Sequence, residues 1–162
     1  MKTLAIMLLT IALAGMGCEP SSRQVNVPVA RPSNGPMVVF PDGFKIDCEL
    51  ADTDETRQQG LMYRESLAPG KGMIFIFTQA GFYPFWMKNT LIPLDMIWLD
   101  GTKKIVSISE KVPPCAADPC PTYPPTGNAL YVLEIAGGEA AKHHLKSGDS
   151  VVMQHFENFV AR

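Results

Sequence analysis

Hydrophobic and polar residues alternate along several short segments of the chain, and this alternation predicts strands. In residues 45–51 (KIDCELA), Ile46, Cys48 and Leu50 lie on one side, while charged residues lie on the other. This segment is expected to form a half-buried strand. Residues 73–77 (MIFIF) are wholly apolar and rich in strand-forming side chains, which favours a strand buried on both faces.

The carboxyl-terminal half of the chain continues this pattern. Residues 96–110 contain two strand-like runs on either side of Asp100 and Gly101, which predicts a hairpin whose turn uses the positive φ available to glycine. Residues 129–135 and 150–156 each predict one further strand.

Two segments have helical character instead. Residues 51–65 offer Asp52 or Thr53 as an N-cap, with Asp52 and Glu55 at capping-box spacing and Gly60 near the expected end. Residues 138–146 predict a second short helix. Because strands outnumber helices, the expected fold is mainly β (α+β): a small single-domain β-barrel-like or sandwich fold with two short helices.

The amino terminus has the layout of an export signal. Lys2 precedes an apolar run over residues 4–14, which is too short to anchor the chain across a bilayer. Cys18 follows a small residue, as in a bacterial lipobox, although Gly15 stands where a large aliphatic residue is usual; ordinary cleavage after residues 12–14 is the alternative. Either route exports the protein.

These features divide the chain into three parts. Residues 1–17 are expected to be a signal peptide of the lipoprotein type, and residues 18–36, rich in proline, a flexible tether. Residues 37–162 are expected to form a single globular β-rich domain. The expected location is the periplasm or the extracytoplasmic membrane face, with the membrane as a partner through a lipid on Cys18.

Composition excludes several classes of function. The chain carries 14 basic and 16 acidic residues, a formal net charge of −2, and no run of Lys or Arg, so nucleic acid is not an expected partner. No phosphate-binding glycine loop or hydrolase motif is present, and we expect no cofactor. No metal site is expected either, because the adjacent His143 and His144 would point about 100° apart on a helix.

Four cysteines are present in a chain that is expected to be exported, where disulfides can form. Cys115 and Cys120 lie in one proline-rich loop, and with Cys18 acylated their pairing is the simplest assignment. Cys48 is then a buried small hydrophobic residue. A redox pair is the alternative, but the prolines that flank Cys120 do not allow the helix on which such a pair normally depends.

Polar side chains interrupt the apolar stretch 84–98 (PFWMKNTLIPLDMIW), and a charge in such a stretch requires a partner or a function. Because Pro93 suits a connection, residues 89–95 are expected to link two strands and to lie at a strand end. Two further residues are candidates: Tyr123, which is amphipathic, and Glu134, which places a carboxylate on an apolar strand. The candidate binding residues are Trp86, Lys88, Asn89, Thr90, Asp95, Tyr123 and Glu134. An ion pair of Glu134 with Arg57 or Arg64 is the structural alternative to a functional role.

Six segments, in order, resemble the bacterial and archaeal domain-of-unknown-function family 192: GLMYRESL, GMIFIF, FWMKNTLIPLDMIWLD, VPPCAADPCPTYPP, YVLEIAGG and LKSGDSV. The resemblance covers nearly all of residues 45–155. It implies a small, mainly β, frequently exported domain without an assigned activity. The two cysteines of the loop, Cys115 and Cys120, resemble a feature of one subgroup of this family.

Three classes of function remain. The first is an envelope binding or accessory module that takes a polar ligand, such as a sugar or peptide fragment of the cell wall. The second is a hydrolase or lyase that uses Asp95 or Glu134 as acid or base, with Lys88 stabilising charge. The third is a structural lipoprotein without a ligand, in which Lys88 and Asp95 form an internal ion pair.

Overall fold

The computed structural model describes residues 35–156, and nine strands and two short helices account for its regular structure in that range. This confirms the mainly β class with two short helices. The elements are, in chain order, β1 (Met37–Val39), β2 (Lys45–Ala51), α1 (Asp54–Gln59), β3 (Lys71–Gly81), β4 (Phe85–Trp86), β5 (Leu94–Leu99), β6 (Ile105–Val112), β7 (Thr122–Tyr123), β8 (Ala129–Ala136), α2 (Glu139–Lys142) and β9 (Val152–Gln154).

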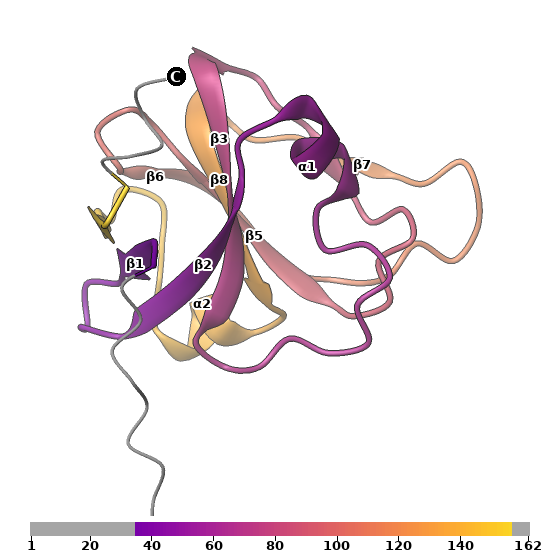
Figure 1. Ribbon diagram of the computed structural model, residues 1–162, viewed down its shortest axis with the longest axis horizontal. Helices are drawn as coiled ribbons and strands as arrows, with labels where there is room; N and C mark the ends of the chain where they lie inside the picture. Colours follow the sequence, from indigo (N-terminus) through magenta and orange to yellow (C-terminus); the bar gives the residue numbers. More distant parts are fainter. Residues whose placement is uncertain (1–34, 157–162) are drawn as a thin grey trace, which may run out of the picture. The chain divides into compact units, whose positions relative to one another are not determined.

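Seven of the strands form one sheet in the order β6-β5-β8-β3-β2-β1-β9, which curls into a half-barrel (Figure 1). The neighbours β2 and β3 are parallel, and every other neighbouring pair in this sheet is antiparallel. A parallel pair needs a crossover connection, and the segment that contains α1 supplies it. The remaining strands, β4 and β7, pair with each other as a two-stranded ribbon.

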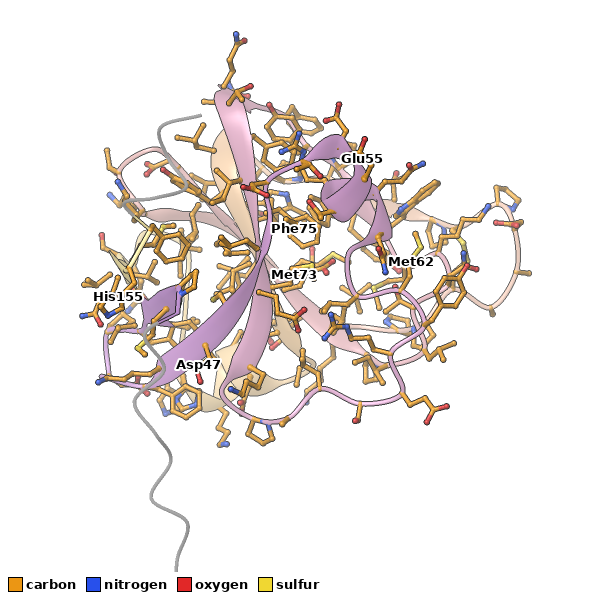
Figure 2. All side chains as sticks on the ribbon, viewed as in Figure 1. Asp47, Glu55, Met62, Met73, Phe75 and His155 are labelled. Atoms are coloured by element: carbon orange, nitrogen blue, oxygen red, sulfur yellow. A yellow bond between two sulfur atoms is a disulfide. The ribbon has the colours of Figure 1, made fainter. Side chains whose placement is uncertain are left out.

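The sheet is buried on both faces, and alternate residues of each central strand belong to different cores. In β3, Met73 and Phe75 pack in the cluster that includes Leu61, just after α1. Ile74 and the residues in register with it pack in the other cluster, which includes Ala140 of α2. We call these sides the α1 face and the α2 face. Figure 2 shows Phe75 and Met73 on the side of β3 nearer to α1.

Helix α1 forms within the predicted segment and starts from Thr53, one of the two predicted N-caps, but its capping box is not the predicted one. Thr53 is the N-cap, and its hydroxyl accepts from the backbone N–H of Thr56, whose side chain in turn accepts from the backbone N–H of Thr53. The capping box expected between Asp52 and Glu55 is therefore wrong. Threonine at both positions satisfies two backbone donors reciprocally, and the helix ends at Gly60 with a φ of 49°.

The hairpin between β5 and β6 is confirmed, but its turn works differently from the prediction. The residue with positive φ is Lys103 (φ 66°), not Gly101. Asp100 holds the turn instead, because its Oδ1 accepts from the backbone N–H groups of Thr102 and Lys104. A carboxylate that caps the turn thus replaces the glycine on which the sequence prediction relied.

The expected signal peptide and most of the expected tether lie outside the described residues. Within residues 35–156, no helix is long and apolar enough to cross a membrane.

Candidate functional site

A pocket of about 270 Å³ opens on the α1 face of the sheet. The sheet forms its floor, α1 and the turn after it form one side, and the segment around β4 forms the other. The lining residues are Arg57, Gln58, Gln59, Gly60, Leu61, Met62, Phe75, Phe77, Tyr83, Pro84, Phe85, Trp86, Lys88, Thr90 and Glu134. Four of the predicted candidates, Trp86, Lys88, Thr90 and Glu134, therefore share one pocket.

Aromatic rings build most of the apolar wall. Phe85 meets Phe75 edge to face at a centroid distance of 4.8 Å, and Phe77 stacks on Tyr83 at 3.6 Å. The indole N–H of Trp98, beneath the wall, donates to the carbonyl of Tyr83 and so holds the segment before β4 against the sheet. Rings fixed in this way present preformed apolar surfaces to anything that enters the pocket.

Trp86 lies at the mouth of the pocket rather than in the core. Its side chain is 46% exposed, whereas Trp98, on the same face of the sheet, is fully buried. The ammonium group of Lys88 lies 5.8 Å from the centroid of the Trp86 ring, within the range of a cation–π contact. Trp86 can therefore contact a ligand without serving as a core residue.

Glu134 provides the acidic group of the floor. It lies in β8 opposite Met73 on one side and Met96 on the other, and only 4% of the residue is exposed. Its carboxyl group makes no hydrogen bond or ion pair with any residue between 35 and 156. Burial without a compensating partner raises the pKa of Glu134 to about 8. The group is therefore mostly protonated at neutral pH.

Gly60 keeps the approach to this carboxyl group open. A Cβ atom at this position would lie 3.2 Å from the ring of Phe75 and 3.8 Å from Oε2 of Glu134. The φ of 49° at Gly60 also disfavours a residue with a side chain. The helix end therefore approaches the floor closely without filling the space above Glu134.

The two basic residues of the lining have carboxylate partners other than Glu134. Arg57 pairs with Asp54 at 2.6 Å and also donates to the carbonyl groups of Asp52 and Ile76. The ion pair of Glu134 with Arg57 or Arg64, which the sequence left open, is therefore wrong.

Arg64 does not line this pocket and binds Glu49 through two hydrogen bonds of 2.5 and 2.6 Å. These bonds lower the pKa of Glu49. Arg57 and Arg64, the two predicted partners of Glu134, therefore both pair with other carboxylates.

The disulfide loop reaches a residue at the mouth of the pocket. Cys115 and Cys120 are bonded, which confirms the predicted pairing, and Cys48 is free and buried, as expected. Burial raises the pKa of the Cys48 thiol to about 12. Between the two bonded cysteines, Asp118 lies 3.5 Å from the ammonium group of Lys88. The loop thus places a carboxylate beside the cation at the pocket mouth.

Asp95 is not part of this site, and its expected place in an exposed connection is wrong. It lies within β5, is fully buried and faces the opposite side of the sheet from Glu134. Its carboxylate accepts from the backbone N–H groups of Lys111, Gly138 and Ala140 at 2.7 to 2.8 Å. The Lys88–Asp95 ion pair of the structural alternative is also wrong, because Lys88 pairs with Asp118 and Asp95 ties β5 to β6 and to the start of α2.

The other predicted residues lie near the pocket. Asn89 lines a neighbouring hollow, and its amide donates to the hydroxyl of Tyr63, which joins the turn after α1 to the segment after β4. Tyr123 pairs with Phe85 in the β4–β7 ribbon and supports the wall from behind. Thr90 lines the pocket, and its hydroxyl donates to the carbonyl of Lys88.

The aromatic wall was not predicted from the sequence. Phe75 and Phe77 belong to a strand that was interpreted only as core, while Tyr83 and Phe85 come from the run FYPFW at 82–86. This dense aromatic run beside the polar stretch was an available signal. Among residues 35–156, no three His, Cys, Asp or Glu side chains lie close enough together to hold a metal ion.

Comparisons with known proteins agree with this architecture. A crystal structure from Novosphingobium aromaticivorans DSM 12444, of a protein of unknown function, is 32% identical with a TM-score of 0.66, covering 84% of this chain and 99% of that one. A second, from Sinorhizobium meliloti 1021 and provisionally named a transcription regulator, is 30% identical with a TM-score of 0.66, covering 74% and 92%. No curated protein matches the chain.

The family comparison covers most of the described residues. The model of family DUF192, described as an uncharacterised group, matches residues 37–153. This range includes β1 to β8, the first two residues of β9 and every residue that lines the pocket. The chain therefore belongs to domain-of-unknown-function family 192.

Proposed function

We propose that the protein is an exported, lipid-anchored envelope protein that binds a small polar ligand in the pocket on the α1 face. The observation that carries the proposal is the combination in one preformed pocket of fixed aromatic rings with a buried acidic group and a cation at the mouth. Small-molecule sites typically combine mostly apolar walls with a few convergent polar groups. A sugar or peptide fragment of the envelope fits this description.

Export and anchoring rest on the amino-terminal sequence. The short apolar run and Cys18 support a lipid anchor, and residues 18–36 supply the length of chain that would separate the anchor from the domain. The disulfide is consistent with an oxidising compartment. The chain has 14 basic and 16 acidic residues, so it has no excess of positive charge that would attract a polyanion. We therefore do not propose nucleic acid as a partner.

A second candidate function is a hydrolase or lyase in which Glu134 is the general acid. The observation in its favour is the raised pKa of about 8, because a carboxyl group that remains protonated at neutral pH can donate its proton to a leaving group. Asp95 has no part in this candidate, since it faces the other side of the sheet.

The binding proposal can be tested by retention. The full chain, purified in mild detergent and immobilised, is incubated with envelope extract, and the bound small molecules are identified by mass spectrometry. We expect a discrete component to be retained, and Trp86→Ala to lose it, because Trp86 forms part of the pocket mouth. The exposed Phe82, which does not line the pocket, provides the matched control, and Phe82→Ala should retain the component.

The other outcomes of this experiment select among the remaining functions. A component that is consumed, with loss of the conversion in Glu134→Gln, would establish the enzyme. A chain that retains and converts nothing would contradict the binding proposal and favour a structural lipoprotein.

Anchoring has its own test. Expressed in a bacterial host, the chain should be recovered with the membrane fraction, and Cys18→Ser should release it, because the substitution removes the thiol that would carry the lipid. The distribution is measured by fractionation and the amino terminus by mass spectrometry. Recovery of the unaltered chain solely as a soluble form that starts at Gly15 would contradict lipidation and leave secretion alone.

A further inference from the structure

The charges around the pocket do not balance once Glu134 is ionised. Both basic residues of the lining are compensated, Arg57 by Asp54 at 2.6 Å and Lys88 by Asp118 at 3.5 Å. Glu134 is the buried acidic group of the lining and has no partner in the described part of the chain. An ionised carboxylate in such a place costs several kcal/mol unless a cation accompanies it.

We propose that this pocket binds a primary ammonium group, which pairs with the Glu134 carboxylate while the attached carbon chain packs against Phe75 and Phe85. This inference rests on the proposed binding function and narrows it to ligands that carry an amine. The amine replaces the ion pair that no residue between 35 and 156 supplies.

The aromatic wall suits a cation. A ring presents a negative face, so an ammonium or guanidinium group within about 6 Å of the ring centre is attracted to it. Two rings of the pocket lining are already used in this way, with the guanidinium carbon of Arg57 at 5.6 Å from the centre of Phe77 and the ammonium of Lys88 at 5.8 Å from that of Trp86. Phe75 and Phe85, nearer the floor, have no such cation from any residue between 35 and 156.

The dimensions of the pocket limit the ligand to an end group. A volume of about 270 Å³ lies just below the range of known ligand sites, which begins at about 300 Å³. Gly60 leaves the space above Glu134 open, and any side chain at this position would narrow it. An aminoalkyl group of a peptide or an amino sugar fits this space, whereas the polymer that carries it would remain outside.

Binding of an ammonium group should depend on pH through Glu134. The charged or titratable groups of the lining are Arg57 from α1, Tyr83 and Lys88 from the segment around β4, and Glu134 from β8. Between pH 6 and 9, Glu134 passes through its raised pKa of about 8, and it must lose its proton to receive the cation.

The test uses butylammonium as the probe and the full chain in mild detergent, with affinity measured by calorimetry between pH 6 and 9. We expect the affinity to rise about tenfold per pH unit up to the pKa of about 8 and then to level off. Proton release on binding, obtained from buffers with different ionisation enthalpies, should approach one per ligand at pH 6. 1-Butanol, the neutral analogue, should not bind more tightly at higher pH.

Matched variants separate this mechanism from a general effect of pH. Glu134→Gln should bind butylammonium with an affinity independent of pH, similar to that of the unaltered chain at pH 6 and about a hundredfold weaker at pH 9. Glu110, an exposed carboxyl group of β6 outside the pocket, provides the control, and Glu110→Gln should keep the full pH dependence. An affinity that is flat or falls with pH in the unaltered chain, or a butanol profile like that of butylammonium, would overturn the proposal.

Two further probes distinguish the source of the amine. Nα-acetyl-lysine amide represents a peptide and D-glucosamine an amino sugar, each compared with its counterpart without the amine, and tighter binding of either amine supports the inference. If the envelope component of the retention experiment depends on Trp86 but not on Glu134 or on pH, the binding function stands and the ammonium inference fails. If butylammonium behaves as expected but no envelope component is retained, the ammonium inference stands and the proposed binding of an envelope component fails.

Discussion

Replacing Glu134 by glutamine should stabilise the protein in alkaline solution by roughly 4–5 kcal/mol and leave it nearly unchanged below pH 4.5. The pKa of Glu134 is raised from 4.5 to about 8 in the folded protein because the group is buried without a partner. Between these values the unfolded chain releases a proton that the folded chain must keep, which costs about 1.4 kcal/mol per pH unit. The unaltered chain therefore keeps its full stability with respect to Glu134 below pH 4.5, and it loses this stability as the pH rises to 8.

Urea unfolding curves of the two chains, measured from pH 4 to pH 9, test this expectation. Groups with lowered pKa values, such as Asp42, Glu49 and Asp100, also change stability with pH, but at the acid end and equally in both chains. The difference between the two curves therefore isolates Glu134. Glu110→Gln should show no such difference, and parallel curves for Glu134→Gln and the unaltered chain would contradict a desolvated carboxyl group at this position.

The same experiment connects stability with ligand binding. A ligand that binds only the folded state raises its stability according to concentration and affinity. Butylammonium should therefore recover part of the stability that the unaltered chain loses above pH 7, and it should do so less in Glu134→Gln.

Asp95→Ala should be the most damaging single substitution of a polar residue, at about 3–6 kcal/mol. Three backbone N–H groups, those of Lys111, Gly138 and Ala140, donate to this fully buried carboxylate. Each buried donor that loses its acceptor costs about 1–3 kcal/mol. The three donors belong to separate parts of the chain, so the substitution loosens the junction of β5, β6 and α2 together.

Urea unfolding at pH 7 measures this loss, and Asp95→Asn provides a milder variant if the alanine variant does not fold. Asparagine keeps one acceptor oxygen but places an NH₂ group against a backbone donor, so an intermediate loss is expected. Asp118→Ala is the control, because this side chain is 68% exposed and its contact with Lys88 should contribute less than about 1 kcal/mol. An effect of Asp95→Ala no larger than that of Asp118→Ala would contradict the buried junction.

The sequence predicted most of the strands because their signal is local. Alternation over residues 45–51 placed Ile46 and Cys48 on the buried side, and the wholly apolar run at 73–77 indicated burial on both faces, as the structure has it. The disulfide was equally accessible, since two cysteines five residues apart in one loop can meet without help from the rest of the fold. Details of turns and caps were less secure, because several neighbouring residues can supply the same hydrogen bond.

The residues of the site were predicted in part. The polar stretch at 84–98 contains Trp86, Lys88 and Thr90, all of which line the pocket, and the carboxylate on an apolar strand identified Glu134. Asp95 carried the same signal as Glu134, a charge in an apolar run, but has a purely structural environment. An unusual residue type therefore marks a position that needs an explanation without saying which explanation applies.

By itself, the sequence determined most of the segments that become strands, most of the side chains that are buried and which polar residues are exceptional, because these properties depend on periods of a few residues. Only the tertiary structure decided the roles of the two carboxylates. Pairing of β5 with β8 sets Met96 opposite Glu134 and Asp95 opposite Ile135, which places the two acidic groups on opposite faces of the sheet. Since a shift of one residue would exchange the faces, these roles depend on strand register, which is set by contacts between segments far apart in the chain.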